Sequence, residues 1–329
     1  MKPLVWGILS VSKHYALRVH PALRGLAAAE VRAIASRSLS KAREAAARFG
    51  IEKAYGSYEE LLADPGIEAV YIPLPNDMHA EWIRRCADAG KHVLCEKPFG
   101  MNAAETEAAV RYAESKGVRV MEAFMYRFHP QWRRVREIIA DGELGEIHSI
   151  HVQQAFMNRD PKNIRNKTEN GGGAVYDIGC YAVSAARFLL NAEPKRVVAL
   201  LERDADFGTD VLSSAILDFG RARALFTVST ASWPGQRVDI RGTEGEILIR
   251  LPVNMFTDVP AEVTVTTRIA SRALALGPAD QYALMFEAFC RAVREDKPVP
   301  TPPSDGIANM KVLDALFRSG ESGRWEDVR

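Results

Sequence analysis

The chain has 329 residues, 47% hydrophobic and 26% charged, a composition typical of a globular protein with a large core. Its formal net charge of +1 excludes the basic footprint of a nucleic-acid-binding protein. No apolar run approaches the roughly 18 residues of a bilayer span, and the first apolar run begins too early to leave room for a secretory signal. We therefore expect a cytoplasmic protein without membrane contact, whose scattered cysteines are reduced and buried.

The first 125 residues alternate between short apolar runs and amphipathic stretches that end at glycines. The apolar runs predict strands buried on both faces, and the stretches between them predict helices. The predicted strands are Leu4–Leu9, Val31–Ala35, Ala69–Ile72, His92–Cys95 and Val118–Glu122, and the predicted helices are Ser40–Phe49, Met78–Ala89 and Ala103–Lys116. This order predicts an α/β Rossmann domain with a doubly wound parallel sheet over residues 1–124.

From about residue 145 the pattern changes to successive strands joined by turns. These strands are Ile147–Met157, Lys195–Glu202, Val211–Phe219, Ala222–Ala231, Arg237–Gly242, Glu246–Arg250 and Glu262–Thr267. Helices are predicted at Val175–Leu190, Gln281–Arg294 and Gly306–Ser319. This pattern predicts that residues 125–329 form an α+β domain with a large, mostly antiparallel open sheet. A further possibility is that the C-terminal helices of this domain pack back on the first domain.

A glycine-rich turn between the first strand and the first helix is the mark of dinucleotide binding. Here Gly7 is followed by Ser10, Val11 and Ser12, so serines stand where two glycines are expected. Serine keeps the backbone N–H groups that hold a pyrophosphate and adds a hydroxyl donor. Ser10, Val11 and Ser12 are therefore candidates for cofactor binding. The alternative is an ordinary strand-to-helix loop with a serine N-cap.

The end of the second predicted strand bears on which cofactor binds. A site for NAD has an Asp or Glu about 20 residues after the glycine-rich turn, where it accepts hydrogen bonds from the ribose. This chain has Ser36 and Arg37 there, with Lys41 close behind. A guanidinium suits the 2′-phosphate, so these residues favour NADP over NAD. The alternative is a solvated arginine and a serine N-cap for the next helix.

Further motifs follow in order along the chain: Tyr71–His79, Cys95–Phe99, Met121–Pro130 and Gly171–Tyr181. Together they resemble the glucose–fructose oxidoreductase/inositol dehydrogenase (Gfo/Idh/MocA) family, and the likeness covers nearly the whole chain. Met121–Pro130 is similar to the branch that holds dimeric dihydrodiol dehydrogenase and NADP-dependent xylose dehydrogenase.

The resemblance implies cofactor contacts beyond the first turn, several of them around the nicotinamide end. The residues implied are Leu74, Pro75, Asn76, His79, Glu96, Lys97 and Arg127. For Asn76 the alternative is an N-cap of the helix expected from Met78. For Arg127 the alternative is an ion pair with an acidic neighbour on the following helix.

Hydride removal from a carbinol carbon requires a base for the hydroxyl proton, and the reverse reaction requires an acid. Lys97 follows a buried strand, so it lies at the carboxyl edge of the sheet, where open α/β folds bind ligands. Asp177 and Tyr181 are spaced i, i+4 early in a helix, so both project from one face. We hypothesise that Tyr181 exchanges the proton, Lys97 lowers its pKa and holds the reacting oxygen, and Asp177 orients the sugar or the lysine. The family assigns comparable roles to the matching positions.

Each of these catalytic assignments has a structural alternative. A lysine before proline is usually a solvated surface residue, and an i, i+4 Asp/Tyr pair is usually a helix-face hydrogen bond.

Gly171–Gly173 is expected to let the backbone pass close to a ligand.

These observations predict an NADP(H)-dependent oxidoreductase that moves hydride between nicotinamide and a CH–OH or C=O group of a sugar, polyol or trans-vicinal diol. Two alternatives are a redox-neutral sugar-processing enzyme that keeps its NAD(P) bound and a non-catalytic sugar or nucleotide sensor. The histidines lack metal-ligand spacing, so no metal site is expected. The expected partners are a small-molecule substrate and, by the resemblance, further copies of this chain in a homodimer or homotetramer through the open sheet.

Overall fold

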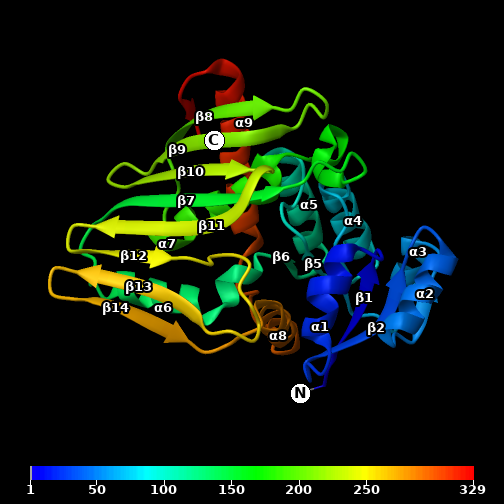
Figure 1. Ribbon diagram of the computed structural model, residues 1–329. Helices are drawn as coiled ribbons and strands as arrows, with labels where there is room; N and C mark the ends of the chain where they lie inside the picture. The colour runs from blue at the N-terminus through cyan, green and yellow to red at the C-terminus, as the bar shows by residue number, and fades with distance from the viewer. Residues whose placement is uncertain (1) are drawn as a thin grey trace. The chain divides into compact units, whose positions relative to one another are not determined.

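The computed structural model describes residues 2–329, which divide into two compact units. The first unit contains the chain up to Met125 together with Tyr282–Ile307, and the second contains Tyr126–Gln281 and Ala308–Arg329. Figure 1 shows the helices and strands of both units, coloured from blue at the N-terminus to red at the C-terminus. A segment close to the C-terminus thus belongs to the first unit.

A parallel sheet forms the centre of the first unit. Within residues 2–329 its six strands lie in the order β3-β2-β1-β4-β5-β6, which confirms the doubly wound sheet. They are β1 (Leu4–Leu9), β2 (Ala29–Ala35), β3 (Lys53–Tyr55), β4 (Ala69–Ile72), β5 (His92–Cys95) and β6 (Val120–Glu122). The chain winds outward from β1 in both directions, so the strand order reverses between β1 and β4. Open α/β sheets bind their ligands at such a point.

Helices cover both faces of this sheet. They are η1 (Tyr15–Val19), α1 (His20–Leu23), α2 (Leu39–Phe49), α3 (Tyr58–Ala63), α4 (Asn76–Asp88), α5 (Ala103–Ser115) and α8 (Gln281–Arg294). The sequence analysis missed β3 and α3 because both are short. A capping signal was nevertheless present at α3, where the Ser57 hydroxyl accepts from the backbone N–H of Glu60 at 3.1 Å.

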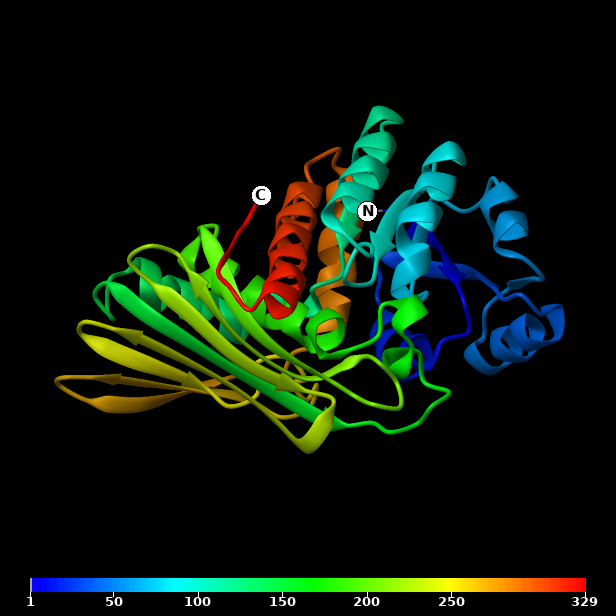
Figure 2. The ribbon, with the colours of Figure 1, turned by 90° about the horizontal axis from the view of Figure 1, so that it is seen from above.

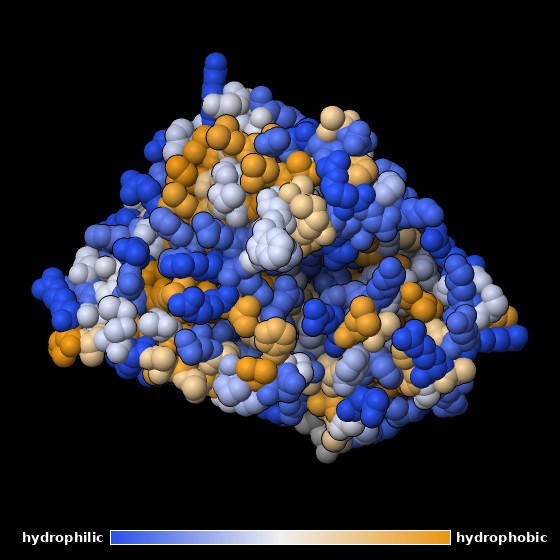
Figure 3. Space-filling view, in the orientation of Figure 1, coloured by the Kyte–Doolittle hydropathy of each residue, from blue (hydrophilic) through white to orange (hydrophobic). Residues whose placement is uncertain are grey.

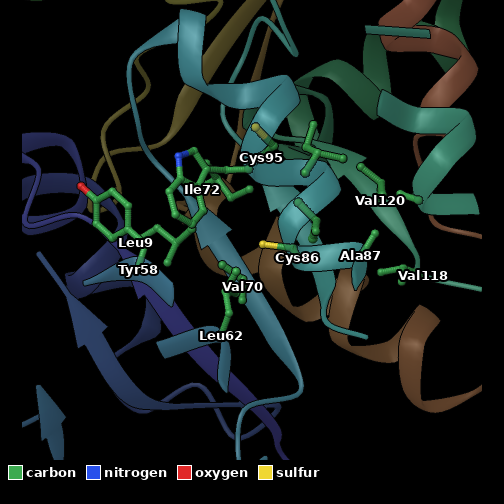
Figure 4. Close-up of a cluster of buried hydrophobic side chains, with 14 of the residues drawn as sticks. Leu9, Tyr58, Leu62, Val70, Ile72, Cys86, Ala87, Cys95, Val118 and Val120 are labelled. Atoms are coloured by element: carbon green, nitrogen blue, oxygen red, sulfur yellow. The ribbon is translucent and has the colours of Figure 1, made fainter. Parts of the chain in front are cut away.

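The core of the first unit lies between the sheet and its helices. In Figure 4, side chains of β1, β4, β5 and β6 meet those of α3 and α4, and none of the labelled residues is more than 7% exposed. On the opposite face of β1, the Trp6 ring packs against Phe286 and Phe289 of α8, with ring centroids 4.9 and 5.3 Å apart. Strands buried on both faces explain the apolar runs of the sequence.

A nine-stranded sheet dominates the described part of the second unit, in the order β14-β13-β12-β11-β7-β10-β9-β8-β15. Only β7 and β10 pair in parallel, which confirms the mostly antiparallel sheet. The strands are β7 (Ile147–Met157), β8 (Arg196–Arg203), β9 (Asp210–Asp218), β10 (Arg223–Ser229), β11 (Ala231–Gly242), β12 (Gly245–Ile249), β13 (Ala261–Thr267), β14 (Ser271–Leu276) and β15 (Glu326–Asp327). Neither β14 nor β15 was predicted.

The helical elements of the second unit gather on one face of this sheet. The longer ones are α6 (Pro130–Ala140), α7 (Cys180–Leu190) and α9 (Pro303–Ser322), of which α6 was not predicted. Short helical turns are η2 (Met125–Phe128), η3 (Ile164–Asn166), η4 (Thr168–Asn170) and η5 (Val175–Gly179). Figure 2 shows that the opposite face of the sheet carries no helix in the part of the chain that the structure describes.

Three findings bear on expectations drawn from the sequence. None of the helices within residues 2–329 combines the length and apolar character needed to cross a membrane. The same residues contain no group of three or more His, Cys, Asp or Glu side chains placed to hold a metal ion. All four cysteines are buried, as expected.

Candidate active site

The first turn after β1 has an unusual backbone conformation at Ser10. Its φ of 103° lies in a region that glycine adopts and other residues rarely do. The Ser10 N–H donates to the carbonyl of Ala35 at 3.0 Å, which joins the turn to the end of β2. Ser10 thus adopts a backbone conformation typical of the glycine that the dinucleotide-binding pattern expects here. Val11 and Ser12 follow as partly exposed residues of the turn.

Ser12 also has a structural role within this turn. Its hydroxyl accepts from the backbone N–H of Tyr15 at 3.0 Å, so it caps the helical stretch that begins at Lys13 and continues into η1. The serine cap that the sequence left open for this loop is therefore present. A cap and a phosphate contact use different groups of the turn, so one does not exclude the other.

The end of β2 lies beside this first turn. The pKa of the buried Tyr58 phenol is raised by burial and held back by a hydrogen bond with Ser10 and by the positive charge of Arg37. Ser10 and Arg37 thus face the same tyrosine. Arg37 and Lys41 are exposed, whereas Ser36 is partly buried and donates its N–H to Tyr55. The sequence-predicted phosphate and ribose positions are therefore neighbours in the structure.

The segment after β4 differs from one expectation. The helix α4 begins at Asn76 itself, and its N-cap is Pro75. The interpretation of Asn76 as the N-cap of a helix from Met78 is therefore wrong, because the helix starts two residues earlier. Leu74, at 5% exposed, precedes this helix start, and together these residues follow the carboxyl end of β4.

His79 is fully buried and contacts two carbonyl groups of its own chain. Its Nδ1 lies 2.7 Å from the carbonyl oxygen of Pro98, and its Nε2 lies 2.9 Å from that of Leu74. Burial lowers the pKa of His79, against the effect of the two carbonyls. The ring therefore connects the segment after β4 to the residues that follow Lys97.

Glu96 and Lys97 follow β5 directly. The Glu96 Oε1 atom lies 2.5 Å from the Tyr71 hydroxyl and 3.2 Å from Nε2 of His14. Burial alone would raise the pKa of Glu96, but the charge and proximity of His14, the Tyr71 hydrogen bond and the charge of Lys97 bring it down to about 2. Glu96 is thus an ionised carboxylate held inside the first unit, with Lys97 partly exposed beside it.

Glu122, at the end of β6, forms a further hydrogen bond close to Lys97 in the sequence. Its Oε1 accepts the backbone N–H of Phe99 at 3.0 Å, and Glu122 is 1% exposed. Together with His79, Glu122 holds the backbone of the two residues after Lys97. The sequence analysis did not single out Glu122 or His14. Glu122 lay inside a quoted motif, and His14 followed the candidate turn.

The Gly171–Gly173 turn in the second unit approaches the chain itself. The N–H of Gly172 donates to the Lys167 carbonyl and that of Gly173 to the Arg165 carbonyl, both at 2.9 Å. A Cβ on Gly172 would lie 2.5 Å from the Arg165 carbonyl oxygen. The close approach expected toward a ligand is therefore made, in this structure, toward the segment that carries Arg165.

Asp177 and Tyr181 lie on the helical segment that follows this turn. Over Val175–Gly179 the segment is a π-helical turn, so the regular helix expected from Val175 begins only at Cys180. Such turns are frequent at functional sites. The Asp177 carboxylate accepts from Nε of Arg165 at 2.7 Å, a partner that the sequence did not suggest. Tyr181 is 7% exposed, with its ring 5.9 Å from that of Tyr126.

Arg127 lies against the same helix. Its guanidinium donates to the Ser184 hydroxyl at 2.7 Å and lies over the Phe188 ring at 5.0 Å. The Ser184 hydroxyl is also 2.7 Å from the Tyr126 hydroxyl. The structure thus groups Arg127 with Asp177 and Tyr181 in the second unit, whereas all other predicted cofactor and catalytic residues lie in the first unit.

Comparison with known proteins yields matches along most of the chain. Residues 6–124 match the oxidoreductase family with an NAD-binding Rossmann fold, and residues 132–248 match the GFO/IDH/MocA C-terminal domain. D-xylose 1-dehydrogenase (NADP(+)) 2 of Haloferax volcanii is 39% identical, over 97% of this chain and 98% of its own length. Trans-1,2-dihydrobenzene-1,2-diol dehydrogenase of Mus musculus is 36% identical, over 74% of this chain and 73% of its own.

A solved structure matches this chain over nearly its whole length. The 3-ketoreductase of Actinomadura kijaniata in complex with NADP and TDP-benzene superposes with a TM-score of 0.91 and 30% identity, over 96% of this chain and 98% of that one. These matches confirm the family and the branch inferred from the motifs. The chain belongs to the Gfo/Idh/MocA family and is an oxidoreductase with an NAD(P)-binding Rossmann domain.

Proposed function

We propose that this oxidoreductase uses NADP(H) and acts on a CH–OH or C=O group of a sugar, polyol or trans-vicinal diol. The observation that carries the proposal is that Ser10, Arg37 and Lys97 follow the carboxyl ends of β1, β2 and β5 in one parallel sheet. Ligands of open α/β folds bind at that edge. The names of the two relatives, a xylose dehydrogenase and a dihydrodiol dehydrogenase, support the substrate class.

The first unit fits NADP on two observations. The glycine-like backbone of Ser10 suits a turn whose N–H groups hold a pyrophosphate. The exposed Arg37 stands where an NAD site has a carboxylate, and its guanidinium suits a 2′-phosphate. NADP bound there supplies the hydride acceptor for oxidation or, in reduced form, the hydride donor for reduction.

The chain's own residues handle the proton and the orientation of the substrate. In the proposed scheme Tyr181 takes the hydroxyl proton on oxidation and returns it on reduction. Lys97 holds the reacting oxygen through its ammonium group, and Asp177 orients the sugar. The ion pair between Arg165 and Asp177 supports this role for Asp177, because it restricts the carboxylate to one orientation.

The test follows nicotinamide absorbance while the protein is mixed with NADP⁺ or NAD⁺ and a panel of aldopyranoses, inositols and trans-diols. Lys97→Met runs alongside, with Lys116→Met on the surface of the first unit as the matched control. We expect turnover with NADP⁺ that falls by about two orders of magnitude or more in Lys97→Met, with NADPH binding retained. Lys116→Met should behave as the wild type.

Two results would contradict the proposal. Equal turnover in Lys97→Met would remove Lys97 from the reaction. Silence across the panel, with nicotinamide released when the purified protein is denatured, would indicate a redox-neutral enzyme that keeps its cofactor.

We also propose that the open face of the nine-stranded sheet joins two or four copies of the chain. Leu225, Ile216 and Val198 lie in one row across β10, β9 and β8. Leu200 and Leu212 on the same face are 76% and 39% exposed. Figure 3 shows hydrophobic surface over these strands. Contact with a second copy would remove these apolar side chains from water, at roughly 25 cal/mol per Å².

A further inference from the structure

A buried carboxylate lies beside the segment that carries Asp177 and Tyr181. Asp210, the first residue of β9, is 1% exposed. Its Oδ2 accepts the backbone N–H of Val175 at 2.7 Å and the hydroxyl of Ser213 at 2.8 Å. Val175 is the first residue of the π-helical turn η5, so a strand residue 35 positions away holds the start of this turn.

Gly173 makes the room that this carboxylate needs. A Cβ at Gly173 would lie 2.0 Å from Oδ1 of Asp210 and 2.9 Å from its carboxyl carbon, so no other residue fits there without displacing the carboxylate. The φ of Gly173 is 116°, a conformation that side-chain-bearing residues rarely adopt. The Gly173 carbonyl in turn accepts the N–H of Asp177 at 3.1 Å. Asp210 and Gly173 therefore bind the backbone N–H groups of Val175 and Asp177, two residues apart in the first part of this turn.

The start of the helical segment favours a negative group at this position, whereas burial opposes it. The first N–H groups of a helix have no partner within the helix, and they carry the positive end of its dipole. Burial raises the pKa of Asp210 to about 6, against the hydrogen bonds from Ser213 and Val175 and the positive charge of Arg203, a residue that lies opposite Asp210 in the register of β8 and β9. Asp210 is therefore mostly ionised above neutral pH and meets the positive end of the segment as an anion.

We propose that Asp210 is a positioning residue for the reaction: through the N–H of Val175 it sets the turn that carries Asp177 and the start of α7 that carries Tyr181. This inference rests on the proposed function. Asp210 does not exchange a proton with the substrate in this scheme. Its role is to keep the backbone between Gly173 and Tyr181 in one conformation. This restraint limits the positions that the side chains of Asp177 and Tyr181 adopt.

The test compares three variants with the wild type at pH 8, using the panel substrate that gives turnover with NADP⁺. Asp210→Ala removes the acceptor, and Asp210→Asn keeps an oxygen that can take the place of Oδ2. Ser213→Ala leaves the carboxylate but removes a hydroxyl that orients it. Asp218→Asn, at the far end of the same strand, is the matched control.

We expect Asp210→Ala to lower kcat about tenfold to hundredfold, since a displacement of about 1 Å costs that much, with the Kd for NADPH within about twofold of the wild type. Asp210→Asn should keep most of kcat, and Ser213→Ala should lose about threefold. A role in stability alone would lower the melting temperature of Asp210→Ala without changing kcat per folded molecule. That result, or equal losses in Asp210→Ala and Asp210→Asn, would overturn the proposal.

Amide hydrogen exchange separates this inference from the proposed function. Peptides that cover residues 174–182 should exchange faster in Asp210→Ala and at nearly the wild-type rate in Asp210→Asn. If the wild type turned over nothing in the panel, the proposed function would fail. The same exchange pattern would still show that Asp210 restrains the backbone of the turn η5. Unchanged exchange in Asp210→Ala would overturn that hold. If Asp210→Ala does not fold, the smaller expected losses in Ser213→Ala, measured the same way, decide the question.

Discussion

The imidazole of His79 spans two backbone carbonyls, with Nδ1 2.7 Å from the oxygen of Pro98 and Nε2 2.9 Å from that of Leu74. One of these carbonyls directly follows Lys97 and the other precedes the helix start at Asn76. A neutral imidazole donates from one nitrogen only, so one carbonyl is paired and the other is in close contact. A single buried side chain thus connects two segments that the motifs marked as functional.

Replacement of His79 by Ala should weaken both segments. It leaves a buried carbonyl without a donor and opens a cavity, so the free energy of unfolding should fall by about 2–4 kcal/mol. Urea denaturation measures this change, and His148→Ala, on an exposed strand position, is the control. Turnover per folded molecule should fall as well, because Pro98 follows Lys97. An unfolding free energy equal to that of the wild type would contradict the connecting role of His79.

Arg37 should decide the preference between NADP and NAD. Loss of a charge-assisted contact to the 2′-phosphate weakens binding by roughly 1.5–3 kcal/mol, which is about 10- to 100-fold in Kd. Arg37→Ala should therefore raise the Kd for NADPH by that factor and leave the Kd for NADH nearly unchanged. Fluorescence titration of both cofactors checks this, with the exposed Arg43→Ala on α2 as the control. Equal weakening for both cofactors would exclude a 2′-phosphate contact.

Gly306 makes room for the Phe99 ring. A Cβ at Gly306 would lie 2.5 Å from Cδ2 of Phe99 and 2.9 Å from Oε2 of Glu122. Gly306→Ala should therefore cost about 1–3 kcal/mol of stability, because both neighbours are buried. Thermal unfolding measures the loss. At Gly277 an added Cβ meets no atom within 4 Å, so Gly277→Ala is the control and should melt as the wild type.

Asp64 should contribute to the loss of stability in acid. The ion pair with Lys53 (2.9 Å), followed by the N–H of Gly66 and the hydroxyl of Tyr55, lowers the pKa of Asp64 to about 2, against the effect of burial. Because the folded pKa lies below the unfolded one, this contribution of roughly 2 kcal/mol is present above about pH 4 and is lost as the pH falls toward 2.

The variant Asp64→Asn isolates this contribution. Its unfolding free energy should be lower than that of the wild type at pH 7, and the difference should shrink on going to pH 2.5. Urea denaturation at several pH values follows both proteins. Asp258→Asn, at an exposed loop position, should show no such pH-dependent difference. A difference that stayed constant from pH 7 to 2.5 would argue against the ion pair as its source.

Leu200 should contribute to self-association through the open sheet. Its side chain is 76% exposed, on the same face of the sheet as the row formed by Leu225, Ile216 and Val198. Leu200→Asp would place a charge in the proposed contact, where burying it without a partner is unfavourable. Analytical ultracentrifugation should then show a smaller assembly than for the wild type. Leu17→Asp, at a residue that is 68% exposed in the first unit, is the control, and equal dissociation in both would argue against this surface.

The sequence by itself determined the elements whose burial leaves a local signal. Strands such as β1 and β4 are covered on both faces, so they appear as continuous apolar runs, and their predicted bounds agree with the structure. Short elements such as β3 and α3 were missed, because three to six residues show no clear period. The family motifs predicted that the chain is an oxidoreductase, and they marked Lys97, Asp177 and Tyr181 as candidate catalytic residues.

Only the tertiary structure decided how these marked residues are held. Asp210 fell just outside the strand predicted from Val211, yet it binds the N–H of Val175, and Arg165 was unmarked but pairs with Asp177. Glu122 likewise binds the N–H of Phe99 from another strand. Such contacts join residues far apart in the chain, and a donor and an acceptor that meet only after packing leave no periodic pattern in either segment. Local burial is therefore encoded in sequence, whereas the pairing of buried polar groups depends on the folded arrangement.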